Sequence, residues 1–261
     1  MLYAATRLSV NVNKIATIRN ARGGSLPCPI EAAQRLCDWG VEGITVHPRP
    51  DGRHITYDDV RRMRDLVGAS GAEFNIEGYP NDTFMQLVAE VRPDQVTLVP
   101  DPPDVLTSNA GWDTVKNAGQ LREVLATLRA IRLRSSLFIG VEPGMIEGAA
   151  ALGAKRIELY TEAYAVGFSK AARAAGAAQT AVAPYAEAAK RAAVLGLGVN
   201  AGHDLDLDNL AFFDENLPEL LEVSIGHAFV SDALYLGMRE TLARYRACLV
   251  GQSSTANPAA K

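Results

Sequence analysis

Short apolar runs rich in β-branched residues alternate along this 261-residue chain with stretches of helical periodicity. Such alternation is typical of βαβ units, in which a crossover helix joins two parallel strands. Helical stretches are expected at 30–39, 57–68, 82–91 and 181–196. The apolar runs predict eight strands, at 8–13, 43–47, 73–77, 95–99, 135–139, 156–160, 198–202 and 222–226.

The even spacing of these eight units predicts a closed sheet. Right-handed crossovers between parallel strands give either an open doubly wound sheet or a barrel, and even spacing favours the barrel. A barrel of this kind needs roughly 250 residues. The expected fold is therefore α/β, a single-domain (β/α)₈ TIM barrel over residues 1–250 with extra helical excursions. Two connections are unusually long: 101–118, which is expected to close over the site, and the Ala-rich excursion 161–180. The small, polar tail 251–261 is expected to be disordered.

The charge of the chain gives no sign of a polyanionic partner. The net charge is −4, from 26 basic and 30 acidic residues scattered along the sequence. Nucleic acid and anionic membranes select basic stripes or patches, so neither is expected as a partner. An anionic ligand would have to be held locally.

Cysteine usage and the N-terminus point to the cytoplasm. Cys28, Cys37 and Cys248 form no CxxC pair and leave an odd count, which favours reduced thiols over disulfides or zinc. The chain starts directly in a strand-like run, and no apolar run approaches the roughly 18 residues that span a bilayer. We expect a cytoplasmic protein that is neither exported nor inserted in a membrane.

Polar side chains collect where the predicted strands end. In (β/α)₈ barrels, substrate-binding and catalytic groups lie at the carboxyl ends of the strands and in the following loops. No histidine falls on a predicted helix; all four lie at strand ends or in the next loop. Histidine exchanges protons near neutral pH, and a carboxylate can share this role, so the set predicts a proton-transfer site. Its members are Asn11, Asn13, His47, His54, Glu77, Asn200, His203 and His227.

Arginines in the first two loops are candidates for binding phosphate. Arg49 and Arg53 follow the second predicted strand, and Arg19 and Arg22 follow the first. Planar guanidinium groups suit phosphate oxygens. A solvated surface charge is the alternative, above all for Arg19 and Arg53, whereas the position of Arg49 beside His47 favours a ligand role.

The eighth strand and the sixth strand each carry one more candidate feature. Gly226 permits close backbone approach before His227, and helical N–H groups after it could hold an anion, so a second phosphate site is expected there. Glu158 lies inside an apolar run, where a buried charge costs several kcal/mol unless it is paired. Glu158 is therefore either a site residue or half of a buried ion pair with an arginine.

Six ordered segments resemble motifs of the pyridoxine 5′-phosphate synthase family, and the resemblance covers roughly residues 7–245. The first two read NVNKIATIRNARG at 11–23 and GITVHPR at 43–49. The others are RHI at 53–55, NIE at 75–77, VNAGH at 199–203 and IGHA at 225–228.

This resemblance implies a metal-independent condensation of 1-deoxy-D-xylulose 5-phosphate with 3-amino-2-oxopropyl phosphate, without a cofactor, in a homo-oligomer of octameric type. It assigns proton acceptance to His47 and Glu77, proton donation to His203, and stabilisation of charge in the transition state to Glu158. It implies that the deoxyxylulose phosphate is bound by Arg49, His54 and Thr107, and the aminoketone phosphate by Asn11, Arg22, Gly226 and His227.

Three positions depart from the pattern of many relatives. Asn13 and Lys14 stand where Asp and His are common, and Asp204 stands where Gly is common. All three are expected in or beside the site as substrate-binding candidates, and Lys14 can donate to a substrate oxygen. The acid–base residues are retained, so the expected reaction class is unchanged.

Two alternative functions remain open. Two histidines and a carboxylate can bind a divalent metal, as in a metal-dependent barrel hydrolase or aldolase. The same barrel could instead be a non-catalytic protein that binds vitamin B6 phosphates.

Overall fold

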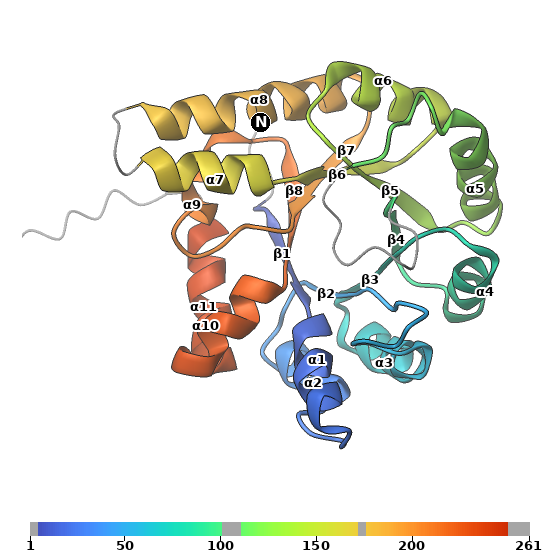
Figure 1. Cartoon of the computed structure of the whole chain (residues 1–261), viewed down its shortest axis with the longest axis vertical. Helices are drawn as coiled ribbons and strands as arrows, with labels where there is room; N and C mark the ends of the chain where they lie inside the picture. Colours follow the sequence, from blue (N-terminus) through green and yellow to red (C-terminus); the bar gives the residue numbers. More distant parts are fainter. Residues whose placement is uncertain (1–4, 101–110, 172–175, 250–261) are drawn as a thin grey trace, which may run out of the picture.

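The computed structural model describes residues 5–100, 111–171 and 176–249, and these ranges form a closed barrel of eight parallel strands with helices around it (Figure 1). The strands pair in sequence order, and the eighth pairs with the first. The predicted (β/α)₈ fold is confirmed. The strands are β1 Arg7–Asn11, β2 Gly43–Val46, β3 Glu73–Gly78, β4 Gln95–Leu98, β5 Arg134–Ile139, β6 Arg156–Tyr160, β7 Gly198–Gly202 and β8 Leu220–Ile225.

Within the described residues, every connection between strands holds a helix, the connections after β1 and β6 each hold two, and two further helices follow β8. The long connection after β6 contains α7 and α8, which pack against each other and form the predicted helical excursion (Figure 1). The helices within the described residues are α1 Asn13–Arg22, α2 Pro29–Asp38, α3 Tyr57–Ser70, α4 Asp82–Val91, α5 Ala118–Ala130, α6 Pro143–Leu152, α7 Glu162–Ala171, α8 Ala177–Val194, α9 Leu210–Asn216, α10 His227–Leu236 and α11 Met238–Leu249.

Two local expectations were wrong. Arg19 and Arg22 lie on α1 and not in a loop, and the helix ends at Gly23, whose φ of 70° is readily adopted by glycine. His227 is the first residue of α10, so one histidine does belong to a helix. Because it stands at the helix start, its side chain still lies at the carboxyl end of β8.

Alternation along the strands separates an apolar outer face from a polar interior. In β1, Leu8 and Val10 are buried in the hydrophobic core. Between them, Ser9 lies inside the barrel, where its Oγ is 2.7 Å from Thr45 Oγ1. The same period of two recurs in the other strands. The outer residues hold the helices against the barrel, while the inner residues build hydrogen-bonded layers.

The amino-terminal end of the barrel is closed by ion pairs. Glu73 accepts a hydrogen bond from Arg7 at 2.8 Å and also pairs with Arg134. Arg156 Nη1 donates to Asn200 Oδ1 at 3.2 Å and lies 3.9 Å from Glu222. The predicted site residue Asn200 therefore belongs to this closing layer and not to the strand-end site. Because side chains fill this end, a cavity inside the barrel can open only at the carboxyl ends of the strands.

Parts of the predicted organisation lie outside the described residues, namely residues 101–110 of the long connection 101–118, with Thr107, and the tail 251–261. Of the helices in the described ranges, none has the length and hydropathy of a membrane span.

Candidate active site

A cavity of about 350 Å³ opens where the carboxyl ends of the strands meet. All the predicted site residues line it except five: Asn200, the arginines Arg19, Arg22 and Arg53, and Thr107, which is not described. The lining also includes Val99, Phe138 and Ser224, which the sequence reasoning missed. Each of these continues the inward period of its strand, so strict alternation would have found them. The predicted residues on the wall are Asn11, Asn13, Lys14, His47, Arg49, His54, Glu77, Glu158, His203, Asp204, Gly226 and His227.

Two asparagines tie the ends of β1, β2 and β3 together. Asn11 Oδ1 accepts from the backbone N–H of Asn13 at 3.0 Å, and Asn13 Oδ1 accepts from the backbone N–H of His47 at 3.0 Å. Asn11 Nδ2 donates to Glu77 Oε2 at 3.5 Å. An aspartate at position 13 would accept the same hydrogen bond, so the departure at Asn13 preserves the placement of His47.

His47 and Glu77 form the central pair of the cavity. His47 Nδ1 lies 3.9 Å from Glu77 Oε2. Burial, with the nearby His54 and Arg49, lowers the pKa of His47 to about 3. Burial raises the pKa of Glu77 to about 7. At neutral pH, His47 is therefore uncharged and Glu77 is divided between its two forms, so both can accept a proton.

Glu158 points into the cavity without a counter-ion. Its side chain is only 4% exposed and makes no ion pair or hydrogen bond with any described residue. The alternative of a buried arginine pair is therefore wrong. A Cβ at position 202 would lie 2.5 Å from Glu158 Oε1, so the absence of a side chain at Gly202 provides the space that the Glu158 carboxyl occupies. Burial, then the nearby Glu77 and Glu222, raise the pKa of Glu158 well above its usual range, so the environment favours the neutral carboxyl over the carboxylate.

Replacement of Glu158 by glutamine is expected to stabilise the protein at pH 8 by about 1–2 kcal/mol. The pKa of Glu158 is higher in the folded protein than in the unfolded chain, where a glutamate has a pKa of about 4.3. The contribution of Glu158 to folding stability is therefore lost as the pH rises from the unfolded-state pKa to the folded-state pKa. Denaturant unfolding of Glu158→Gln should therefore show a gain at pH 8 and little at pH 4. The exposed control Glu215→Gln should change the free energy of unfolding by less than about 0.5 kcal/mol. Equal effects of Glu158→Gln at the two pH values would contradict the buried, protonated state.

His203 stands across the cavity in a strained backbone conformation. Its φ is 100°, in a region that non-glycine residues rarely adopt, and such strain costs about 1–3 kcal/mol. Its ring meets Tyr160 edge-on at a centroid distance of 5.0 Å, and its Nδ1 is 2.7 Å from Asp204 Oδ2. Burial opposes the imidazolium, but the hydrogen bond and charge of Asp204 outweigh it and raise the pKa of His203. Its protonation behaviour is thus opposite to that of His47.

Two regions of the wall suit phosphate groups. In the first, Arg49 is 6% exposed beside His54, whose buried Nδ1 has no hydrogen-bond partner among the described residues. Burial, then Arg49 and Lys14, lower the pKa of His54 to about 4, so it binds as a neutral group. In the second, Gly226 packs against Asn11 and precedes the start of α10 at His227. Backbone N–H groups at such a helix start can hold an anion.

The other candidate arginines do not line the cavity. Arg19 pairs with Asp59 at 2.7 Å and is a structural cation. Arg53 donates to Asp51 Oδ2 at 2.6 Å. Arg22 is exposed at the end of α1 and lies outside the cavity of its own chain.

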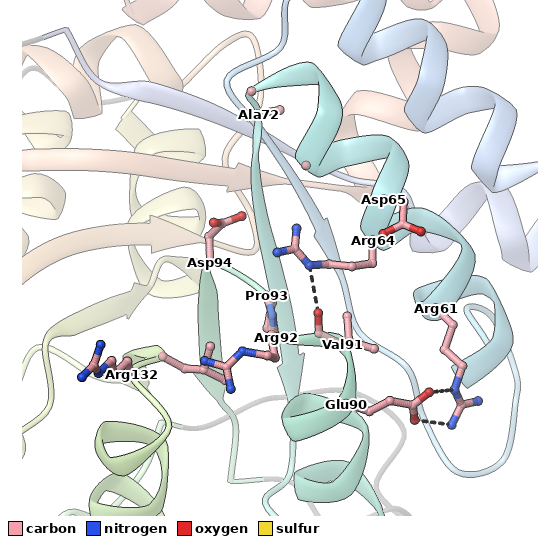
Figure 2. A pocket seen from close by; sticks show the side chains of 13 residues that line it. Arg61, Arg64, Asp65, Ala72, Glu90, Val91, Arg92, Pro93, Asp94 and Arg132 are labelled. Atoms are coloured by element: carbon pink, nitrogen blue, oxygen red, sulfur yellow. Dashed lines mark hydrogen bonds and ion pairs between the residues drawn. The ribbon is translucent and has the colours of Figure 1, made fainter.

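A larger, open cavity of about 960 Å³ lies at the other end of the strands, between α3, α4 and the loop before β5 (Figure 2). Most of its charged groups already have partners. Arg61 pairs with Glu90, Arg64 donates to the carbonyl of Val91, and Arg92 donates to the carbonyl of Ile131. It contains no histidine and no predicted site residue, so size alone does not make it the active site.

Within the described ranges, no three or more His, Cys, Asp or Glu side chains are arranged to hold a metal ion. The strand-end cavity instead offers acid–base groups and anion-binding groups. Together, the fold and the cavity define a (β/α)₈-barrel protein whose strand-end cavity is lined by histidines, carboxyl groups and cationic side chains.

Sequence comparison identifies the family. Residues 8–251 match the model of the family described as pyridoxal phosphate biosynthesis protein PdxJ. The chain is 55% identical over 240 residues to pyridoxine 5′-phosphate synthase of Christiangramia forsetii, covering 92% of this chain and 98% of that relative. It is 54% identical over 241 residues to the Porphyromonas gingivalis protein of the same name, with the same coverage. The chain belongs to the PdxJ family.

Comparison with solved structures reflects the fold alone. A structure of Mycobacterium tuberculosis tryptophan synthase superposes with a TM-score of 0.63 at 14% identity, covering 94% of this chain and 93% of that one. Thiamine phosphate pyrophosphorylase from Pyrococcus furiosus gives 0.60 at 13% identity, covering 93% and 95%.

Proposed function

We propose that this chain is a pyridoxine 5′-phosphate synthase, which condenses 1-deoxy-D-xylulose 5-phosphate with 3-amino-2-oxopropyl phosphate to pyridoxine 5′-phosphate, inorganic phosphate and water. One observation carries the proposal beyond family membership: His47, Glu77, Glu158 and His203 line a single cavity that also has two regions suited to phosphate. A volume of about 350 Å³ lies in the range of small-molecule sites.

The chemistry needs proton transfers and no protein nucleophile. The amine of one substrate attacks the ketone of the other, and imine formation, loss of water and phosphate, and ring closure each move protons. Neutral His47 and ionised Glu77 are suited to accept protons, and protonated His203 is suited to donate one. Binding both substrates in one cavity also removes the entropic cost of bringing them together, which can contribute several kcal/mol.

Protonated Glu158 has a distinct proposed role. As a neutral carboxyl it can donate a hydrogen bond to an oxygen that gains negative charge. When a cationic imine lies beside it, the same group can ionise and stabilise that cation, because an adjacent positive charge lowers the pKa of a carboxyl. Both actions place stabilisation where charge develops.

The phosphates are assigned to the two regions of the wall. Arg49 and His54, with Thr107, are proposed to bind the deoxyxylulose phosphate. Asn11, Gly226 and His227 are proposed to bind the aminoketone phosphate, and Lys14 to donate to a substrate oxygen.

Several broader features are proposed with this function. Residues 1–250 would be one catalytic domain of a cytoplasmic enzyme that needs no cofactor. A homo-oligomer, octameric as the resemblance implies, would cover exposed apolar side chains such as Leu234 and Tyr235, which are 70% and 90% exposed. It would also allow Arg22 to reach the cavity of a neighbouring copy. A monomer mass in light scattering would contradict the oligomer.

Treatment with a chelator distinguishes the proposed synthase from a metal-dependent hydrolase or aldolase. Purified protein treated with EDTA should release phosphate over many turnovers when both substrates are supplied, at the rate of untreated protein. The two rival functions give other results. A metal enzyme would lose activity and recover it with added metal, and a non-catalytic binding protein would release no more phosphate than its own molar amount.

A further inference from the structure

Asp204 contacts His203 directly in the loop after β7. Asp204 Oδ2 lies 2.7 Å from His203 Nδ1, and both side chains line the cavity. The backbone of the loop is held on two sides. Asp204 N–H donates to Thr161 Oγ1 at 3.3 Å, and Asn209 Nδ2 donates to the carbonyl of Asp204 at 3.1 Å. The carboxylate is therefore presented to the imidazole by a fixed loop.

The contact selects one form of the imidazole. An ionised carboxylate can only accept hydrogen bonds, so His203 Nδ1 must carry the hydrogen. The proton exchanged with a substrate is then the one on Nε2. A carboxylate that fixes a catalytic histidine in this way acts on its tautomer and orientation without touching the substrate.

Other groups around His203 contribute to its charge. Glu77 on β3 and Glu162 at the start of α7 also favour the imidazolium, but by charge alone, without a hydrogen bond to it. Tyr160 packs edge-on against the ring, and its hydroxyl donates to Glu162 Oε2 at 2.6 Å. Phe138 completes the surroundings at a centroid distance of 6.4 Å. Of these carboxylates, Asp204 is the one that fixes the orientation of the His203 ring as well as favouring its positive charge.

We propose that Asp204 is a positioning residue, which holds His203 with Nε2 free for the substrate and keeps the imidazole protonated as the proton donor of the reaction. This reassigns Asp204 from substrate contact to action through His203. This inference rests on the proposed function only in assigning His203 as the proton donor of the reaction.

The first test needs no substrate, so its failure is distinct from failure of the proposed function. The pKa of His203 is measured by NMR titration of protein labelled with ¹³C-histidine, in which His203→Gln assigns one of the four imidazole signals. Asp204→Asn and Asp204→Gly should each lower this pKa by about one unit, because an adjacent opposite charge is lost. The matched control Asp208→Asn removes an exposed charge from the same loop and should leave it unchanged. An unchanged pKa in both Asp204 variants would overturn the proposal.

The second test uses turnover. In the Asp204 variants, the alkaline limb of the kcat–pH profile should move to lower pH by the same shift as the NMR pKa, with little change in KM. A raised KM with an unmoved limb would show direct substrate binding and would also overturn the proposal.

Discussion

Replacement of Glu77 by glutamine should lower kcat by about 10²–10⁴-fold, the usual contribution of a positioned acid–base group. Glutamine keeps the size of the side chain but cannot accept a proton. Because burial brings the pKa of Glu77 to about 7, kcat/KM of the unmodified protein should fall as pH decreases through that value. In Glu77→Gln this acidic limb should be absent.

The matched control for this substitution is Glu215→Gln, which changes an exposed carboxylate on α9 that does not line the cavity. Steady-state kinetics from pH 5 to 9 compare the two variants. Thermal unfolding checks that Glu77→Gln is folded, since removal of a buried ionisable group should not destabilise it. If folded Glu77→Gln kept its kcat, the assigned role in proton transfer would be wrong.

Replacement of Arg49 by alanine should lower kcat/KM for the deoxyxylulose phosphate by about 10²–10³-fold. A guanidinium makes two charge-assisted hydrogen bonds to a phosphate, each contributing about 1.5–3 kcal/mol, and part of this is retained by neighbouring groups. Arg49→Lys should recover only part of the loss, because an ammonium group cannot bind in the same bidentate manner.

The control is Arg62→Ala, which removes an exposed arginine whose nearest carboxylate partner, on Asp58, is 4.0 Å away. Substrate-saturation kinetics for each substrate in turn measure the effect. A loss confined to the aminoketone phosphate would reverse the assignment of the two phosphate regions. No loss for either substrate would remove Arg49 from the binding site.

The strands could be predicted from the sequence because every second residue of a barrel strand must be apolar to pack against the helices. In β1, Leu8 and Val10 pack on the outer face of the barrel, and Ser9 and Asn11 point inward. The strand-end rule then identified His47 and Glu77 as neighbours on the cavity wall. The same period, applied to β5, would also have predicted Phe138.

The first helix, the place of Asn200 and the pKa values of the histidines depend on tertiary contacts, which local sequence patterns do not reveal. The helix that carries Arg22 has a weak apolar face, with only Ile15 and Ala16 buried, so its periodicity did not mark it as a helix. Asn200 resembled a strand-end residue, yet its depth in the barrel places it with Arg156. The pKa values of His47 and His203 shift in opposite directions because the two rings differ in burial and because Asp204 contacts only His203, and these contacts arise only in the folded chain.

The proposed synthase activity is tested most directly by mass spectrometry of the product formed from ¹⁵N-labelled 3-amino-2-oxopropyl phosphate and unlabelled 1-deoxy-D-xylulose 5-phosphate. We expect ¹⁵N-labelled pyridoxine 5′-phosphate, formed over many turnovers from both substrates together and from neither alone, because the aminoketone supplies the nitrogen of the ring. Folded protein that binds both phosphates but yields no labelled product would contradict it.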